Sequence, residues 1–191
     1  MSFERLYRNG WGAPVAEPPA AGLAPSPALR NGNVQAFLRD YRPLERATRA
    51  ELRAMLESGD AFRDVGEAMS SLGLDTADPV DILAMHHAVH WAVVNRDRVR
   101  REQLPAIRGA VASSALLATL AASGDAARQE AADRAMMLTA IRSREYVALQ
   151  RAGETQALRK YGEQVAAEFL SRHGIDLREG DVDRLPALPV R

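Results

Sequence analysis

Two stretches of 13 or more residues contain no charged residue, and they constrain the fold of this chain more than any other feature. They are residues 82–94 and residues 109–123, and both are rich in alanine together with valine or leucine. A helix that is apolar or small on every side is normally a buried helix. We therefore expect two central apolar helices, at about residues 79–95 and 104–123, surrounded by amphipathic ones.

The remaining main part of the chain has the periodicity and turn residues of helical proteins. Phe62, Val65 and Met69 recur at steps of three and four, which places them on one helix face. Gly73 follows them as a helix-ending residue, and Asp78 precedes a proline as the cap of a new helix. No strand-like alternation of useful length occurs. The sequence predicts an all-α fold, a single helical bundle of six or seven helices.

The N-terminal part of the chain differs from the rest. Half of the ten prolines fall within residues 13–27, among alanine and glycine. Such a composition favours an extended, polyproline-like segment. We therefore divide the chain into an N-terminal aromatic segment and Pro/Ala-rich linker at 1–32, a helical bundle domain at 33–178, and a C-terminal tail at 179–191.

Composition excludes several classes of function. The chain has 25 basic and 25 acidic residues, so it lacks the excess of positive charge that binds a nucleic-acid backbone. It has no cysteine, which excludes disulfides, thiolate metal sites and cysteine nucleophiles. We expect no nucleic-acid partner, no cofactor and no transmembrane segment. The N-terminus lacks the apolar region of a signal peptide, which favours a cytoplasmic location if the chain is complete as given.

Three of the few aromatic residues lie ahead of the proline-rich segment. Phe3, Tyr7 and Trp11 recur every four residues, on one face of a helical turn. One interpretation is that they fold back and cover part of the bundle. The other is that they anchor a protein partner through a tether. The sequence is also compatible with a homo-oligomer.

The first uncharged stretch carries three histidines, His86, His87 and His90. In the simplest interpretation they are neutral core residues that donate to carbonyl groups, and stability then falls in mild acid. In a second interpretation, these histidines act as a pH sensor. A metal site is a third: His86 and His90 share a helix face, and His173 is the available third imidazole.

The sequence contains no recognisable catalytic motif. The chain lacks an HExxH motif, a nucleophile elbow, and the glycine patterns that bind phosphates or dinucleotides. We therefore interpret the protein as a non-enzymatic helical interaction or structural module, with Phe3, Tyr7 and Trp11 as candidate partner-binding residues. The alternative is a small-ligand or metal-binding bundle that uses His86, His90 and His173.

Several segments of the chain resemble a known family. Residues 37–95 and the stretch "HGIDLREGDVD" at 173–183 are similar to small, Ala-rich proteobacterial proteins that form an uncharacterised domain-of-unknown-function family. The matching features are Gly73 at the end of a helix, the helix start "DPVD" at residues 78–81, Trp91 in the central helix, and the sequence "GIDL" at residues 174–177.

This resemblance has three implications. Members are mostly exported, so it implies a periplasmic or secreted protein of the bacterial cell envelope. It also implies that a signal peptide has been removed from the chain as given. Where relatives place large aromatic residues, this chain has His86 and His87. The resemblance therefore implies that these two positions need a bulky planar side chain instead of a metal ligand.

Overall fold

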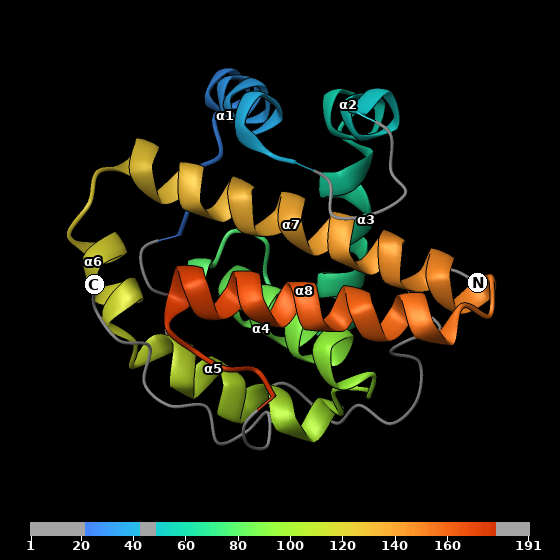
Figure 1. Cartoon of the computed structure of the whole chain (residues 1–191). Helices are drawn as coiled ribbons and strands as arrows, with labels where there is room; N and C mark the ends of the chain where they lie inside the picture. The colour runs from blue at the N-terminus through green and yellow to red at the C-terminus, as the bar shows by residue number, and fades with distance from the viewer. Residues whose placement is uncertain (1–21, 43–48, 179–191) are drawn as a thin grey trace.

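The computed structural model describes residues 22–42 and 49–178, so Phe3, Tyr7 and Trp11 lie outside the described residues. In these two ranges the chain forms eight α helices and one short 3-10 helix without any strand, which confirms the all-α prediction (Figure 1). The elements are α1 (Pro27–Asp40), α2 (Arg49–Glu57), α3 (Asp60–Ser71), α4 (Pro79–Asn95), η2 (Arg101–Gln103), α5 (Leu104–Ala112), α6 (Ala115–Ala121), α7 (Asp125–Arg151) and α8 (Thr155–His173).

Helix α4 lies at the centre of the bundle, as the uncharged run at residues 82–94 within it predicts. The side chain of Asp78 accepts a hydrogen bond from the backbone N–H of Val80 at 2.8 Å, and Pro79 occupies the first turn. This local chemistry fixes the start of the helix independently of packing. α4 packs against α5, α7 and α8, which together cover most of its circumference.

Helix α7 is the second central element. It runs across the middle of the bundle, with α1 and α2 above it and α4, α5 and α8 below it in the view of Figure 1. It contacts α1, α3, α4 and α8. It buries several charged side chains, among them Asp133, Arg142 and Glu145, along with apolar ones. A helix with charges can be central here because those side chains find partners on neighbouring elements.

The prediction that residues 104–123 form a second central helix is wrong. The segment is broken into α5 and α6 at Ser113–Ser114, where the Ser114 hydroxyl caps α6 by accepting from the Leu117 N–H at 3.2 Å. This break is why the bundle has eight α helices in its described part instead of six or seven. α5 buries a single stripe, Leu104, Ile107 and Val111, and much of the remaining segment is exposed.

Helix α1 begins at Pro27, six residues before the start at residue 33 that the sequence suggested. The Ser26 hydroxyl accepts from the Leu29 N–H at 3.4 Å, and Pro27 is the first helical residue. A serine cap followed by proline starts a helix even within a proline-rich stretch. The expected segment boundary at residue 32 therefore falls inside α1.

No helix within the two described ranges is both long enough and apolar enough to cross a bilayer.

Candidate functional site

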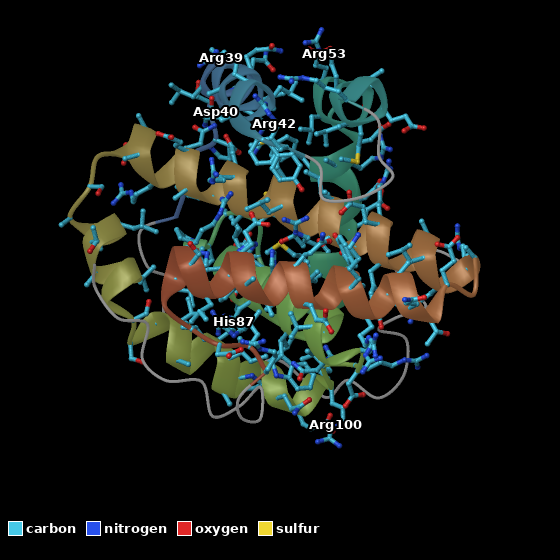
Figure 2. The ribbon with its side chains drawn as sticks, viewed as in Figure 1. Arg39, Asp40, Arg42, Arg53, His87 and Arg100 are labelled. Atoms are coloured by element: carbon cyan, nitrogen blue, oxygen red, sulfur yellow. The ribbon has the colours of Figure 1, made fainter. Side chains whose placement is uncertain are left out.

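All four histidines of the chain meet around one aromatic ring, that of Phe169 on α8. From α4, the centroids of His87 and His90 lie 5.2 and 5.3 Å from the Phe169 centroid, and that of His86 lies 5.9 Å away. His173 follows Phe169 by one turn, at 4.4 Å. Figure 2 labels His87 at the edge of α8 that faces α5. We call these five residues the histidine cluster.

Two of the imidazoles contact each other at a tilted angle and are oriented by backbone carbonyls. The rings of His86 and His90 lie 4.0 Å apart, as residues one helical turn apart can. His90 Nδ1 donates to the carbonyl of His86 at 2.7 Å, and His86 Nδ1 donates to the carbonyl of Ala135 on α7 at 3.3 Å. Since a carbonyl only accepts, both rings carry their proton on Nδ1 in the neutral form.

Burial keeps the histidine cluster neutral. Loss of solvation lowers the pKa of His87 to about 3, with a smaller contribution from His173. Burial and neighbouring imidazoles lower the pKa values of His86 and His90 well below the ordinary value. The pKa of His173 is also lowered, by burial and by nearby Arg172. Neutral buried histidines are the state that the first interpretation of the sequence describes.

The residues of the metal hypothesis come together without forming a set of metal ligands. His86 and His173 approach edge to face, with centroids 6.2 Å apart. Nδ1 of His86 and Nδ1 of His90 are engaged by carbonyl groups. Among the residues that the structure describes, no group of three or more histidine or carboxylate side chains is arranged to hold a metal ion.

A buried arginine lies beside the histidine cluster, and the sequence analysis did not identify it. Arg142 on α7 is 0% exposed. It donates to the hydroxyl groups of Tyr41 at 2.9 Å and Tyr161 at 3.5 Å, and it pairs with Glu168 and, at 3.6 Å, with Glu145. Tyr161 in turn donates to Glu145. These four partners come from α7, α8 and the residue after α1, so one guanidinium joins three parts of the fold.

The electrostatics of this network follow from burial and pairing. Burial raises the pKa of Tyr41 to about 12 and that of Tyr161 well above its ordinary value, so both phenols stay protonated. Burial acts to lower the pKa of Arg142, but Tyr161, Tyr41 and Glu168 raise it overall. A charged guanidinium next to the histidines adds to their resistance to protonation.

A signal for Arg142 did exist in the sequence. Arg142 and Glu145 lie four and seven residues after Leu138, and Leu149 lies four after Glu145. That spacing places all four on one helix face. Leu138 and Leu149 are apolar and buried, so the two charges between them interrupt a core stripe and must be paired.

Two buried nitrogens on α4 lack a partner among the described residues. They are His87 Nε2 and Trp91 Nε1, which lie one turn apart. The side chains are well covered, since His87 is 3% and Trp91 9% exposed. Buried polar atoms in native proteins are usually hydrogen-bonded, to water or ligand if not to protein. His87 Nε2 and Trp91 Nε1 are therefore candidate contacts for such a group beside the histidine cluster.

Other buried charges serve to connect elements. Asp81 pairs with Arg108 of α5, as does Asp78 at 3.2 Å. Asp133 of α7 accepts from Arg30 Nε at 3.0 Å and from Asn33 Nδ2 at 2.9 Å, both on α1. These pairs hold α5 to the start of α4 and α1 to α7.

The uncharged stretch at residues 109–123 forms a surface on α5 and α6, which we call the α5–α6 surface. Ala112, Ser113, Ala118 and Ala121 are exposed, and Leu117 and Leu120 are half-buried. Protein surfaces normally carry interspersed charges, and continuous uncharged stretches are associated with interaction sites.

Comparison of the chain with protein-family models, with curated protein sequences and with solved structures finds no match.

Proposed function

We propose that this protein is a non-enzymatic helical interaction module that docks a protein partner. The observation that carries the proposal is the α5–α6 surface. Residues 109–123 contain no charge, yet much of this stretch is exposed or half-buried instead of covered by the bundle. A surface of small and apolar side chains loses little solvation when a partner covers it.

The interior supports this proposal because its charges work within the fold. Arg142 holds α7, α8 and Tyr41 together, and Asp133 holds α1 to α7. Such paired networks fix the relative positions of helices. A rigid bundle is a suitable base for a surface that recognises a partner.

The N-terminal aromatic residues complete the proposed interface. Phe3, Tyr7 and Trp11 lie outside the described residues and remain candidate partner-binding side chains, since aromatic anchors supply much of the free energy of protein interfaces. Following the resemblance to exported proteins, we propose the bacterial cell envelope as the location of this interaction.

The test compares three full-length proteins, the wild type and two variants, for their ability to capture a protein partner from a bacterial cell-envelope extract. Leu120→Asp introduces a charge on α6, and Leu170→Asp introduces one at the exposed Leu170 of α8 as a matched control. We expect the wild type and Leu170→Asp to retain the same protein, and Leu120→Asp to lose it. Equal capture by all three would overturn the proposal. Circular dichroism checks that each variant is folded.

A second candidate function, binding of a small ligand at the histidine cluster, is favoured by His87 Nε2 and Trp91 Nε1. A ligand oxygen can accept from the indole N–H and from the imidazole in its Nε2–H tautomer. Native mass spectrometry of the untagged protein tests this function. A retained small molecule that is lost in Trp91→Phe, which keeps an aromatic side chain and removes the N–H, supports it; a bare protein mass in both proteins rejects it.

A further inference from the structure

We infer that the C-terminal half of α8, residues 166–173, is a latch that opens away from α4 in mild acid while the rest of the bundle stays folded. The observation that carries this inference is the histidine cluster, in which every imidazole of the chain contacts Phe169 on this half of the helix. The inference is independent of the α5–α6 surface. It adds a conformational response of the protein to its surroundings.

The ring of Phe169 is the one contact that all four imidazoles share. Phe169 is buried, with His86, His87 and His90 of α4 on one side and His173 of its own helix on the other. Moving this ring away from α4 brings water to the three imidazoles of α4 together. One movement of half a helix is therefore coupled to the solvation of several titrating groups.

The closed histidine cluster has no free counter-charge for a protonated imidazole. The charged groups around it are Arg134 and Arg142 of α7, with Tyr41, Tyr161 and Glu145 behind Arg142; Arg172 and Glu168 of α8; and Asp81 of α4 with its partner Arg108 of α5. Glu168 is already engaged, since its Oε1 pairs with Arg172 at 2.9 Å and its Oε2 pairs with Arg142. An imidazolium inside the cluster would therefore face mainly positive charge.

Mild acid favours the open form because that form binds protons that the closed form excludes. Burial lowers the pKa of His87 to about 3, and the pKa values of His86 and His90 also lie well below the ordinary value. In water each imidazole titrates near 6.5. At pH 5.5 each newly exposed imidazole raises the ratio of open to closed molecules about tenfold, so the three of α4 raise it about a thousandfold.

The N-terminal half of α8 is held by contacts that involve no imidazole. The Tyr161 hydroxyl donates to Glu145 of α7. Gly162 lies so close to α4 that a Cβ there would be 3.2 Å from the carbonyl oxygen of Val93. We therefore expect this half to stay in place in mild acid and the chain to bend beyond it.

The C-terminal half depends on the histidine cluster and on one buried ion pair. Phe169 provides its apolar contact with α4, and Glu168 pairs with Arg142. Arg142 keeps its contacts with Tyr41 and Glu145 when Glu168 leaves, because those residues belong to other parts of the fold. Opening therefore does not leave a buried cation without any partner.

The residues that follow α8 resist opening to the same extent at every pH. Ile175 and Leu177 are buried, and Asn95 Nδ2 donates to the Leu177 carbonyl at 2.9 Å. None of these groups titrates. They set how far the pH must fall before the latch opens, and the imidazoles provide the dependence on pH.

The absence of cysteine from the chain allows spin labels at chosen sites of the full-length protein. Ser171→Cys, at an exposed position of α8, is combined with Ser70→Cys, at an exposed position of α3. The control combines Ser70→Cys with Asn31→Cys on α1, which packs on α7 as α3 does. Pulsed electron paramagnetic resonance measures the distance between the two labels from pH 7.5 to pH 5.

We expect the distances between positions 70 and 171 to broaden and lengthen below about pH 6. The change should be on the order of 10 Å, the separation of two packed helices. The distances between positions 70 and 31 should stay unchanged. Adding His87→Phe should reduce the acid-induced rise in the open-to-closed ratio about tenfold, since one proton-binding group is lost. His173→Gln should act in the same direction and serves if His87→Phe does not fold.

Three results would overturn the inference. Distances that change at the same pH in both labelled pairs would show general unfolding instead of a latch. Distances between positions 70 and 171 that stay constant down to pH 5 would show that α8 does not open. An acid-induced change that persists unaltered in both histidine variants would show that the histidine cluster is not the trigger.

Discussion

The guanidinium of Arg142 donates to the hydroxyl of Tyr41 at 2.9 Å, although the two residues are 101 positions apart in the chain. Arg142 lies near the middle of α7, and Tyr41 directly follows α1. The same guanidinium pairs with Glu168 of α8. One buried cation therefore holds the first, seventh and eighth helices in register, and it does so next to the histidine cluster.

Replacing Arg142 by alanine should be strongly destabilising, by about 3–5 kcal/mol, because it leaves buried polar partners from three parts of the fold without their cation. Arg144→Ala is the matched control. Its ion pair with Asp64, at 2.8 Å, is half exposed, and pairs of that kind contribute about 1 kcal/mol or less. Urea unfolding of the two variants measures the difference. Similar losses in both would show that the buried network is not stabilising.

Stability should decrease as pH falls below about 6.5. The pKa of His87 is lowered to about 3 in the folded protein, and those of His86, His90 and His173 are lowered as well. Below pH 6.5 the unfolded chain therefore binds protons that the folded chain excludes. The stabilisation present above pH 6.5 is lost at up to about 1.4 kcal/mol per pH unit for each such histidine.

The measurement is the urea midpoint from pH 7 to pH 5, where the histidines of the unfolded chain take up protons. Other charged groups near the histidine cluster are Arg142, Arg172, Arg134 and Glu168. His87→Phe removes one titrating group and should reduce the slope. A midpoint that stays constant between pH 7 and pH 5 would contradict the prediction.

Adding one methyl group to Gly162 should loosen α8 from α4. A Cβ at this position would lie 3.2 Å from the carbonyl oxygen of Val93 and 3.3 Å from that of Val94, both on the α4 backbone. We expect Gly162→Ala to destabilise the protein by about 1–3 kcal/mol through this overpacking.

Gly109→Ala in α5 is the control, since its Cβ would meet no atom within 4 Å. There the gain in helix propensity should stabilise the protein by about 0.5–1 kcal/mol. Thermal unfolding of the two variants is the comparison, and shifts of the same sign would refute the account of close packing at Gly162.

Removing the carboxylate of Asp133 should release α1 from α7. Asp133 is buried and binds Arg30 and Asn33, so Asp133→Ala leaves two α1 donors without their acceptor. We expect faster amide hydrogen exchange across α1 and a loss of about 2–4 kcal/mol. Asp64→Ala, at a half-exposed carboxylate, should leave exchange in α1 unchanged. Uniform acceleration over all helices would instead indicate general destabilisation.

The sequence predicted α4 well because its signals are local. The Asp78 cap, the following proline and the uncharged run all lie within residues 78–94, and the helix is central as expected. The glycines at positions 73 and 174 also follow or cap their helices in the left-handed conformation that glycine adopts readily. Neutral, buried histidines likewise agree with the first of the interpretations that the sequence allowed.

Which helix forms the second central element of the bundle could not be predicted from the local sequence. Residues 104–123 and α4 both lack extended runs of charge, but α5 and α6 are rich in alanine, which tolerates either water or burial at little cost. α7 carries many charges and still lies in the centre, because Arg30, Tyr41 and Glu168 bring partners to it from distant segments. No periodicity within α7 reveals those partners.

The sequence by itself therefore determined the all-α fold, the start of α4 at Asp78 and Pro79, and the central position of that helix. These outcomes depend on capping groups and on apolar side chains within a few residues of each other. Only the tertiary structure decided that the four histidines meet at Phe169, that Arg142 is buried, and that much of the stretch 109–123 is exposed or half-buried. Burial of a polar group depends on the partners that other segments supply, and exposure of an alanine-rich helix depends on whether any neighbour covers it.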